Sequence, residues 1–109
     1  MDRRRVIEPS NRQIEAAVAM FDALSDMPRL RTLLLLKDRE LSVSEIAATE
    51  GEKMTTVSAR LQILHAARAI TRRRQGKSIL YSIADDHVLS LVENAVAHAG
   101  EIVNKETSP

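Results

Sequence analysis

The stretch of residues 42–83, SVSEIAATEGEKMTTVSARLQILHAARAITRRRQGKSILYSI, carries the pattern on which the fold assignment depends. Ser42 followed by Glu45 is a capping-box pattern, and it opens a short helix that Gly51 ends. Beyond Gly51, apolar side chains recur at helical spacing, which predicts a second helix after a tight turn. Residues 42–67 therefore have the layout of a helix-turn-helix, although any pair of antiparallel helices would look similar.

A predicted β-hairpin follows directly. Residues 70–74 and 79–83 favour strands, and the Gly-containing turn 75–78 joins them. A helix-turn-helix followed by a hairpin over residues 70–83 predicts a winged helix-turn-helix, with the hairpin as the wing. The alternative is a plain structural strand pair with solvated arginines, and the position directly after a basic helix disfavours it.

Helices are predicted on both sides of this central segment. Apolar spacing predicts an amphipathic helix over residues 11–25, a buried helix over 28–38 and a long helix over 85–104. We expect one domain over residues 1–109, mainly α-helical with one β-hairpin, and a flexible arm over 1–10. A domain of this size often gains stability from oligomerisation, and the broad apolar stripe on the last helix calls for a partner, so we expect a homodimer.

Charge is segregated along the chain, although the net charge at pH 7 is only +1. All 15 acidic residues lie outside the segment between Lys53 and Ala84, which nevertheless contains many of the 16 basic residues. The basic residues of the segment are Lys53, Arg60, Arg68, Arg72, Arg73, Arg74 and Lys77. Clustered Lys and Arg favour a nucleic-acid partner, because they neutralise phosphates and release counterions. A merely solvated face is the alternative.

The candidate DNA contacts lie on the second helix of the motif and on the wing. Outward side chains in the first turns of a recognition helix reach base edges. These candidates are Thr55, Thr56, Ser58, Arg60 and Gln62. Arg60 is the strongest individual candidate, whereas the Ser58 hydroxyl could instead bond to its own backbone. On the wing, Arg72, Arg74 and Lys77 are expected to contact phosphates or the minor groove.

Several classes of protein are excluded by what the sequence lacks. The chain has no cysteine, so it cannot form disulfides or thiolate metal sites. It contains no Gly-rich phosphate loop and no nucleophile motif, which argues against an enzyme. No run of 18 or more apolar residues is present, and the basic N-terminal residues precede no apolar signal core. We therefore expect a cytoplasmic protein without a membrane segment.

Two of the three histidines lie on the last predicted helix, where they could bind a metal. His87 and His98 are accompanied by Asp85 and Glu101, and zinc accepts both imidazole nitrogen and carboxylate oxygen. Eleven residues separate the two histidines by roughly 16 Å along one helix, so a single ion cannot contact both in one chain. If two copies pack antiparallel, Asp85 and His87 of one approach His98 and Glu101 of the other. Ordinary polar residues on a dimerisation helix are the alternative.

Over nearly its whole length the chain resembles the ArsR/SmtB family of bacterial metal-sensing repressors. The resemblance rests on residues 24–31 (LSDMPRLR), 56–61 (TVSARL) and 74–82 (RQGKSILYS), of which the last is the most specific. Two positions depart from the family pattern. Ala59 stands where histidine is frequent, and Lys53 stands where a capping Ser or Thr is usual.

The resemblance implies a homodimer that binds an imperfect inverted repeat in operator DNA. Asp85, His87, His98 and Glu101 match the intersubunit site of the branch that responds to zinc, sometimes shared with cobalt or nickel. The implied function is repression that ends when the metal fills these sites. The absence of cysteine argues against the arsenic, cadmium and lead sensors of the family. A metal-independent regulator that responds to another signal is the competing interpretation.

Overall fold

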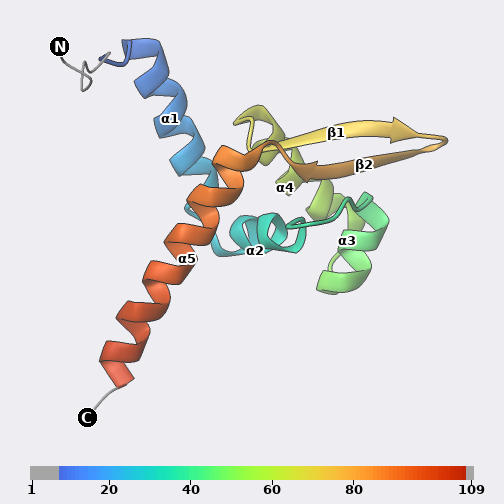
Figure 1. The fold of residues 1–109 in the computed structure, drawn as a ribbon. Coiled ribbons are helices and arrows are strands. Elements are labelled where there is room, and N and C mark those ends of the chain that lie inside the picture. The colour runs from blue at the N-terminus through green and yellow to red at the C-terminus, as the bar shows by residue number, and fades with distance from the viewer. Residues whose placement is uncertain (1–7, 108–109) are drawn as a thin grey trace.

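Five helices and one β-hairpin form the computed structural model, which describes residues 8–107 (Figure 1). The elements are α1 (Asn11–Leu24), α2 (Met27–Leu35), α3 (Val43–Glu50), α4 (Met54–Ala66), β1 (Ile70–Gln75), β2 (Ser78–Ile83) and α5 (Asp86–Thr107). The expected fold, mainly α-helical with a hairpin after a helix-turn-helix, is confirmed. Most of the expected arm over residues 1–10 lies outside the described residues.

Local side-chain caps set where the helices begin. Ser10 and Gln13 form a capping box at the start of α1, and Ser42 and Glu45 form the predicted one at the start of α3. α2 ends at Leu35, whereas the sequence predicted a helix that continues to residue 38. Asp38 adopts a positive φ of 65°, which takes the chain out of helical conformation.

The core lies between α2, α3, α4 and the first half of α5. Its largest fully buried apolar side chains are Leu33, Leu36, Ile46, Val57, Leu61, Leu64, Ile70 and Val92. Helix α4 contributes three of these, all from one side of the helix. Met54, an apolar residue at the start of the same helix, is 53% exposed.

The hairpin projects away from the helices (Figure 1). β1 and β2 pair antiparallel, from Ile70 opposite Ile83 to Gln75 opposite Ser78, and Gly76 adopts a positive φ in the turn. Backbone hydrogen bonds in both directions between Leu41 and Tyr81, at 3.1 and 2.8 Å, tie β2 to the loop before α3. The base of the hairpin is thereby attached to the helix-turn-helix.

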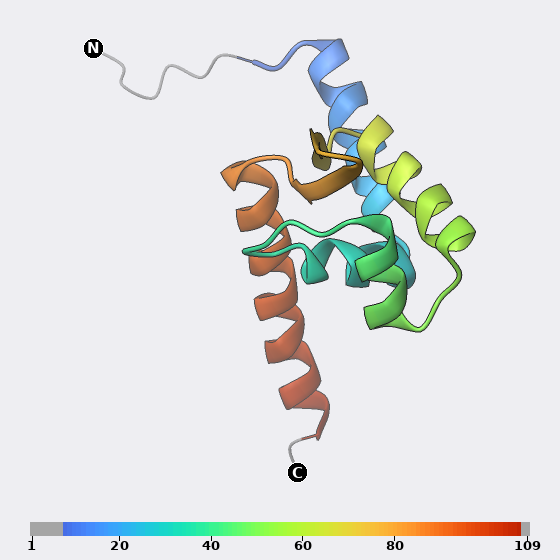
Figure 2. The ribbon, with the colours of Figure 1, turned by 90° about the vertical axis from the view of Figure 1, so that its right-hand side faces the viewer.

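The far half of α5 extends beyond the other helices (Figures 1 and 2). Near its start, Val88 and Val92 are buried, and Glu93 Oε2 forms a 2.8 Å ion pair with Lys37 Nζ in the turn that follows α2. Several large apolar side chains of α1 and α5 remain exposed. They are Ile14, Val18 and Phe21 on α1, and Val96, Ile102 and Val103 on α5. Across residues 8–107, none of the helices combines the length and apolar character needed to span a bilayer.

The turn between α3 and α4 requires a glycine, which gives a first prediction. Gly51 caps α3 with φ 67°, and no atom lies within 4 Å of where a Cβ would stand. Replacing it with alanine therefore adds backbone strain without a clash. We expect Gly51→Ala to lower the free energy of unfolding by about 1 kcal/mol, measured by urea denaturation at one fixed protein concentration.

Gly51→Asn serves as the matched variant, because asparagine tolerates the left-handed conformation better than alanine. Its loss of stability should be the smaller of the two. An alanine variant as stable as the parent would contradict the assigned turn.

Candidate nucleic-acid interface and metal-binding residues

One face of α4 is buried and the other is open to solvent. Because Val57, Leu61 and Leu64 pack into the core, residues on the opposite side of the helix must face outward. The structure places four of the five sequence-predicted contacts of α4 on this exposed surface. They are Thr55, Thr56, Ser58 and Gln62. This polar surface, with Ala59 in its middle, has the size and character of a face that enters a DNA groove.

Arg60, the fifth predicted contact, points into the protein in this structure and not outward as the sequence predicted. Its side chain is only 8% exposed. Its Nη1 donates to Glu50 Oε1 at 2.9 Å, and its Nη2 donates to Glu52 Oε1 at 3.1 Å. The guanidinium is held by carboxylates of α3 and of the turn. The sequence feature that indicates an inward Arg60 is the pair of acidic residues just before α4, Glu50 and Glu52.

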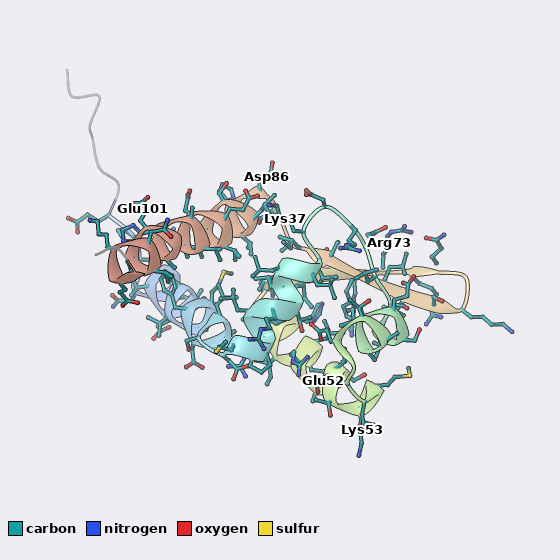
Figure 3. All side chains as sticks on the ribbon, turned by 90° about the horizontal axis from the view of Figure 1, so that it is seen from below. Lys37, Glu52, Lys53, Arg73, Asp86 and Glu101 are labelled. Atoms are coloured by element: carbon teal, nitrogen blue, oxygen red, sulfur yellow. The ribbon has the colours of Figure 1, made fainter. Side chains whose placement is uncertain are left out.

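The start of α4 carries no side-chain cap. Lys53 occupies the N-cap position without a side-chain hydrogen bond to the helix, in agreement with its departure from the usual Ser or Thr. Figure 3 shows its side chain projecting away from the body. An exposed lysine beside a helix N-terminus favours an anionic neighbour, so Lys53 is a candidate contact that the sequence interpretation did not include.

The arginines of the wing point to two different faces of the hairpin. Side chains alternate along a strand, so Arg72 and Arg74 share one face while Arg73 lies on the other. Arg72, Arg74 and Lys77, the three wing residues expected to contact DNA, are all exposed.

Arg73 is bound to the body of the protein instead. Its Nε and Nη2 donate to the two carboxylate oxygens of Glu40 at 2.7 and 2.6 Å, and Nη2 also donates to Gln75 Oε1. This two-point ion pair ties β1 to the loop between α2 and α3. The Arg73 guanidinium also lowers the pKa of the Glu40 carboxyl, because it donates hydrogen bonds to the charged carboxylate. Nothing in the local sequence predicts this pair, because 33 residues separate its members.

The four predicted metal ligands all lie on the surface, at two separate places along α5. Asp85 precedes the helix and caps it, accepting a hydrogen bond from the Val88 N–H at 3.0 Å with Oδ1. His87 is 98% exposed, with Nδ1 3.8 Å from Asp85 Oδ1. His98 and Glu101 are exposed several turns later. Figure 3 shows how far apart Asp86 and Glu101 lie on the helix.

Within the described part of a single chain, no three His, Asp or Glu side chains come close enough together to hold a metal ion. The separation along α5 explains this, since roughly 16 Å of helix lies between the two histidines. Two imidazoles and two carboxylates nevertheless form a donor set that suits zinc. Both pairs, Asp85 with His87 and His98 with Glu101, are exposed and can be reached by a second protein molecule. Asp85 caps the helix with Oδ1 alone.

His65, the third histidine of the chain, is half-buried at the end of α4. Together with Arg68 and Asp85 it lines a hollow of about 450 Å³. It lies on a different element from His87 and His98, which makes it a suitable control residue.

Comparison with known proteins gives relatives that span most of the chain. The transcriptional repressor SmtB homolog of Synechocystis is 34% identical over 104 residues, covering 93% of this chain and 79% of the relative. The HTH-type transcriptional regulator KmtR of Mycobacterium tuberculosis is 39% identical over 87 residues, covering 80% of this chain and 67% of the relative. No protein-family model matches the chain.

A solved structure shares the fold over nearly the same span. It is the homodimeric winged helix-turn-helix DNA-binding domain of Mb0332 from Mycobacterium bovis, a possible ArsR-family transcriptional regulator. The TM-score is 0.79 at 31% sequence identity, and the match covers 88% of this chain and 92% of that one.

The ion pair at the base of the wing gives a prediction about pH. Glu40 has a lowered pKa, so its pair with Arg73 is complete above the ordinary glutamate value of 4.5 and is lost as the pH falls through the lowered value. We expect Arg73→Gln to return the pKa of Glu40 toward 4.5, as measured by an NMR titration of the Glu40 carboxyl carbon.

Arg72→Gln removes the neighbouring arginine on the opposite face of the strand and should leave the pKa of Glu40 lowered. If both variants raised this pKa equally, the general positive charge of the wing would account for it and the specific pair would not.

Proposed function

Because the chain belongs to the ArsR/SmtB family of transcriptional regulators, we propose that it is a homodimeric DNA-binding repressor whose operator affinity falls when a metal ion binds. The relatives are regulators and not enzymes, and we assign no catalytic residue. The observation that carries the proposal is the exposed polar face of α4 next to a basic wing.

In the proposed complex, α4 enters the major groove and the wing follows the neighbouring backbone. Thr55, Thr56, Ser58 and Gln62 offer hydroxyl and amide groups, which suit hydrogen bonds to base edges. Arg72, Arg74 and Lys77 supply exposed positive charge for phosphates or for the minor groove. Phosphate contacts of this kind make the affinity strongly dependent on salt.

The proposed dimer uses the uncovered faces of α1 and α5. Phe21 of α1 and Leu91 of α5 both line two apolar hollows, of about 380 and 230 Å³, to which the end of α4 and α2 also contribute. Contiguous apolar surface of this kind marks an interaction site, and the related Mb0332 domain is a homodimer. A second copy of the chain is therefore the occupant that we propose. A two-fold axis would place the two α4 helices on successive turns of an inverted repeat.

Metal binding is proposed at two equivalent sites between the copies. Asp85 and His87 of one chain would meet His98 and Glu101 of the other, and zinc is the metal we favour, with cobalt or nickel as alternatives. The ion would supply a cross-link between the two α5 helices. Support comes from the donor set, the exposure of all four side chains and their match to the family site.

The position of Asp85 offers a route from metal to DNA. Only Ala84 and Asp85 separate the end of β2 from the start of α5. Ala84 N–H donates to the Ala69 carbonyl at 3.0 Å, which joins this junction to the segment between α4 and β1. A metal ion that holds Asp85 in place would therefore act beside both proposed DNA-binding elements, α4 and the wing. By linkage, metal that weakens DNA binding must itself bind less tightly to the DNA complex.

Zinc-dependent release is the central testable consequence. The affinity of the purified parent for a duplex from the region upstream of its own gene is measured by fluorescence anisotropy, with and without zinc. We expect zinc to weaken binding by roughly 5- to 150-fold, the usual range of allosteric coupling. In His98→Ala the change should be less than roughly twofold, because the proposed site loses an imidazole.

His65→Ala is the matched control, since it removes a histidine outside the proposed site, and it should keep the full zinc response. Tight binding that zinc leaves unchanged in the parent would favour the metal-independent regulator. Loss of the response in His65→Ala and not in His98→Ala would place the sensor elsewhere.

The dimer surface gives a separate prediction. Phe21→Glu places a charge in the proposed apolar interface, where burying it is costly. We expect this variant to be monomeric by light scattering at micromolar concentration while the parent is dimeric. Met27→Glu alters a residue that is 66% exposed and belongs to α2, so it should remain dimeric. A dimeric Phe21→Glu variant would contradict the assigned interface.

A further inference from the structure

A buried ionic cluster joins the recognition helix to three other parts of the fold. Arg60 of α4 donates from Nη1 to Glu50 at the end of α3 and from Nη2 to Glu52 in the turn. Its Nη1 also donates to Thr32 Oγ1 of α2 at 3.2 Å. The Thr32 hydroxyl in turn donates to Glu50 Oε2 at 3.0 Å, so Arg60, Thr32 and Glu50 are each hydrogen-bonded to the other two.

These contacts are directional, unlike the packing beside them. Apolar contacts of Val57, Leu61 and Leu64 decide which side of α4 is buried, but the hydrophobic effect is non-directional and leaves small rotations and shifts of the helix open. The guanidinium of Arg60 is planar, and its N–H groups point in fixed directions like the prongs of a fork. Because this fork donates to acceptors on three separate elements, it restricts how α4 can rotate or shift. Arg60 therefore fixes the position of α4 relative to α2, α3 and the turn.

The cluster also neutralises the two carboxylates that precede α4. Glu50 and Glu52 are the acidic residues nearest in sequence to α4, and Arg60 binds both of them. Arg60 is itself only 8% exposed, so it cannot serve as a phosphate or base contact without breaking three hydrogen bonds. Arg60 therefore acts on DNA only through the helix that carries it.

We propose that Arg60 is a positioning residue for DNA recognition, which sets the angle and register at which Thr55, Thr56, Ser58 and Gln62 reach the bases. This inference rests on the proposed DNA-binding function. Its consequence is specific: loss of the fork should weaken sequence-specific binding, while non-specific attraction to phosphates, which depends on exposed charge, should persist.

Arg60→Lys is the decisive variant, because it keeps the buried positive charge and removes the fork. Removing the charge altogether would leave Glu50, only 15% exposed, without a partner and could unfold the protein. Arg31→Lys is the matched control, the same substitution at an exposed position of α2. Glu52→Gln is a second, milder variant, since Glu52 is 37% exposed and an amide oxygen can still accept the bond.

The experiment compares the affinity of each variant for the duplex upstream of its own gene with that for a scrambled duplex of the same length and composition. Thermal unfolding confirms that each variant is folded. For Arg60→Lys we expect the ratio of the two affinities to fall roughly tenfold, the order expected for one or two displaced base contacts. Affinity for the scrambled duplex should change less than roughly twofold, and Arg31→Lys should match the parent.

An unchanged ratio in a folded Arg60→Lys variant would overturn the inference and leave Arg60 a purely structural residue. An equal fall in both affinities would also overturn it, because it would make Arg60 a source of phosphate attraction. A parent that does not discriminate between the duplexes refutes the proposed function instead.

A second readout needs no DNA. Backbone amide signals of the first two turns of α4 should shift in Arg60→Lys and stay in place in Arg31→Lys. Shifts confined to the immediate neighbours of residue 60 would count against a positioning role.

Discussion

The burial of one side of α4 is the constraint on which the rest of the structure depends. Val57, Leu61 and Leu64 are buried in a core that they share with residues of α2, α3 and α5, so the opposite side of the helix must face outward. Ala69, which is also fully buried, follows within three residues of the end of α4 and starts the hairpin at a defined point. The exposed polar face and the basic wing are neighbours because one buried core places both of them.

The same core is too small to cover α1 and the far half of α5. Phe21 is 57% exposed and Val96 is 43% exposed, and the proposed second copy would remove these apolar side chains from water. The proposed metal ligands lie on the same helix as the proposed dimer contacts. In this account dimerisation, metal binding and the spacing of the two α4 helices are therefore consequences of one interface.

Local patterns in the sequence predicted the elements well, and long-range pairing limited the prediction of the site. The Ser42 capping box, the Gly51 turn and the hairpin depend on neighbouring residues, and all three are present in the structure. Arg60 was predicted to contact a base because arginines on recognition helices commonly donate hydrogen bonds to base edges. Its partners include Thr32, 28 residues away, and the wing pair of Arg73 with Glu40 spans 33 residues. Charge counted along the chain cannot tell which basic side chains are already paired.

α4 and the wing form the proposed DNA-binding surface, and α1 and α5 form the proposed dimer surface. Mapping backbone amide shifts by two-dimensional NMR, as a duplex from the protein's own promoter is added, tests this most directly. The account predicts shifts concentrated at residues 54–62 and at the wing around Lys77, with signals near Phe21 and Val96 unchanged. Shifts confined to α1 and α5, with α4 and the wing unaffected, would contradict it.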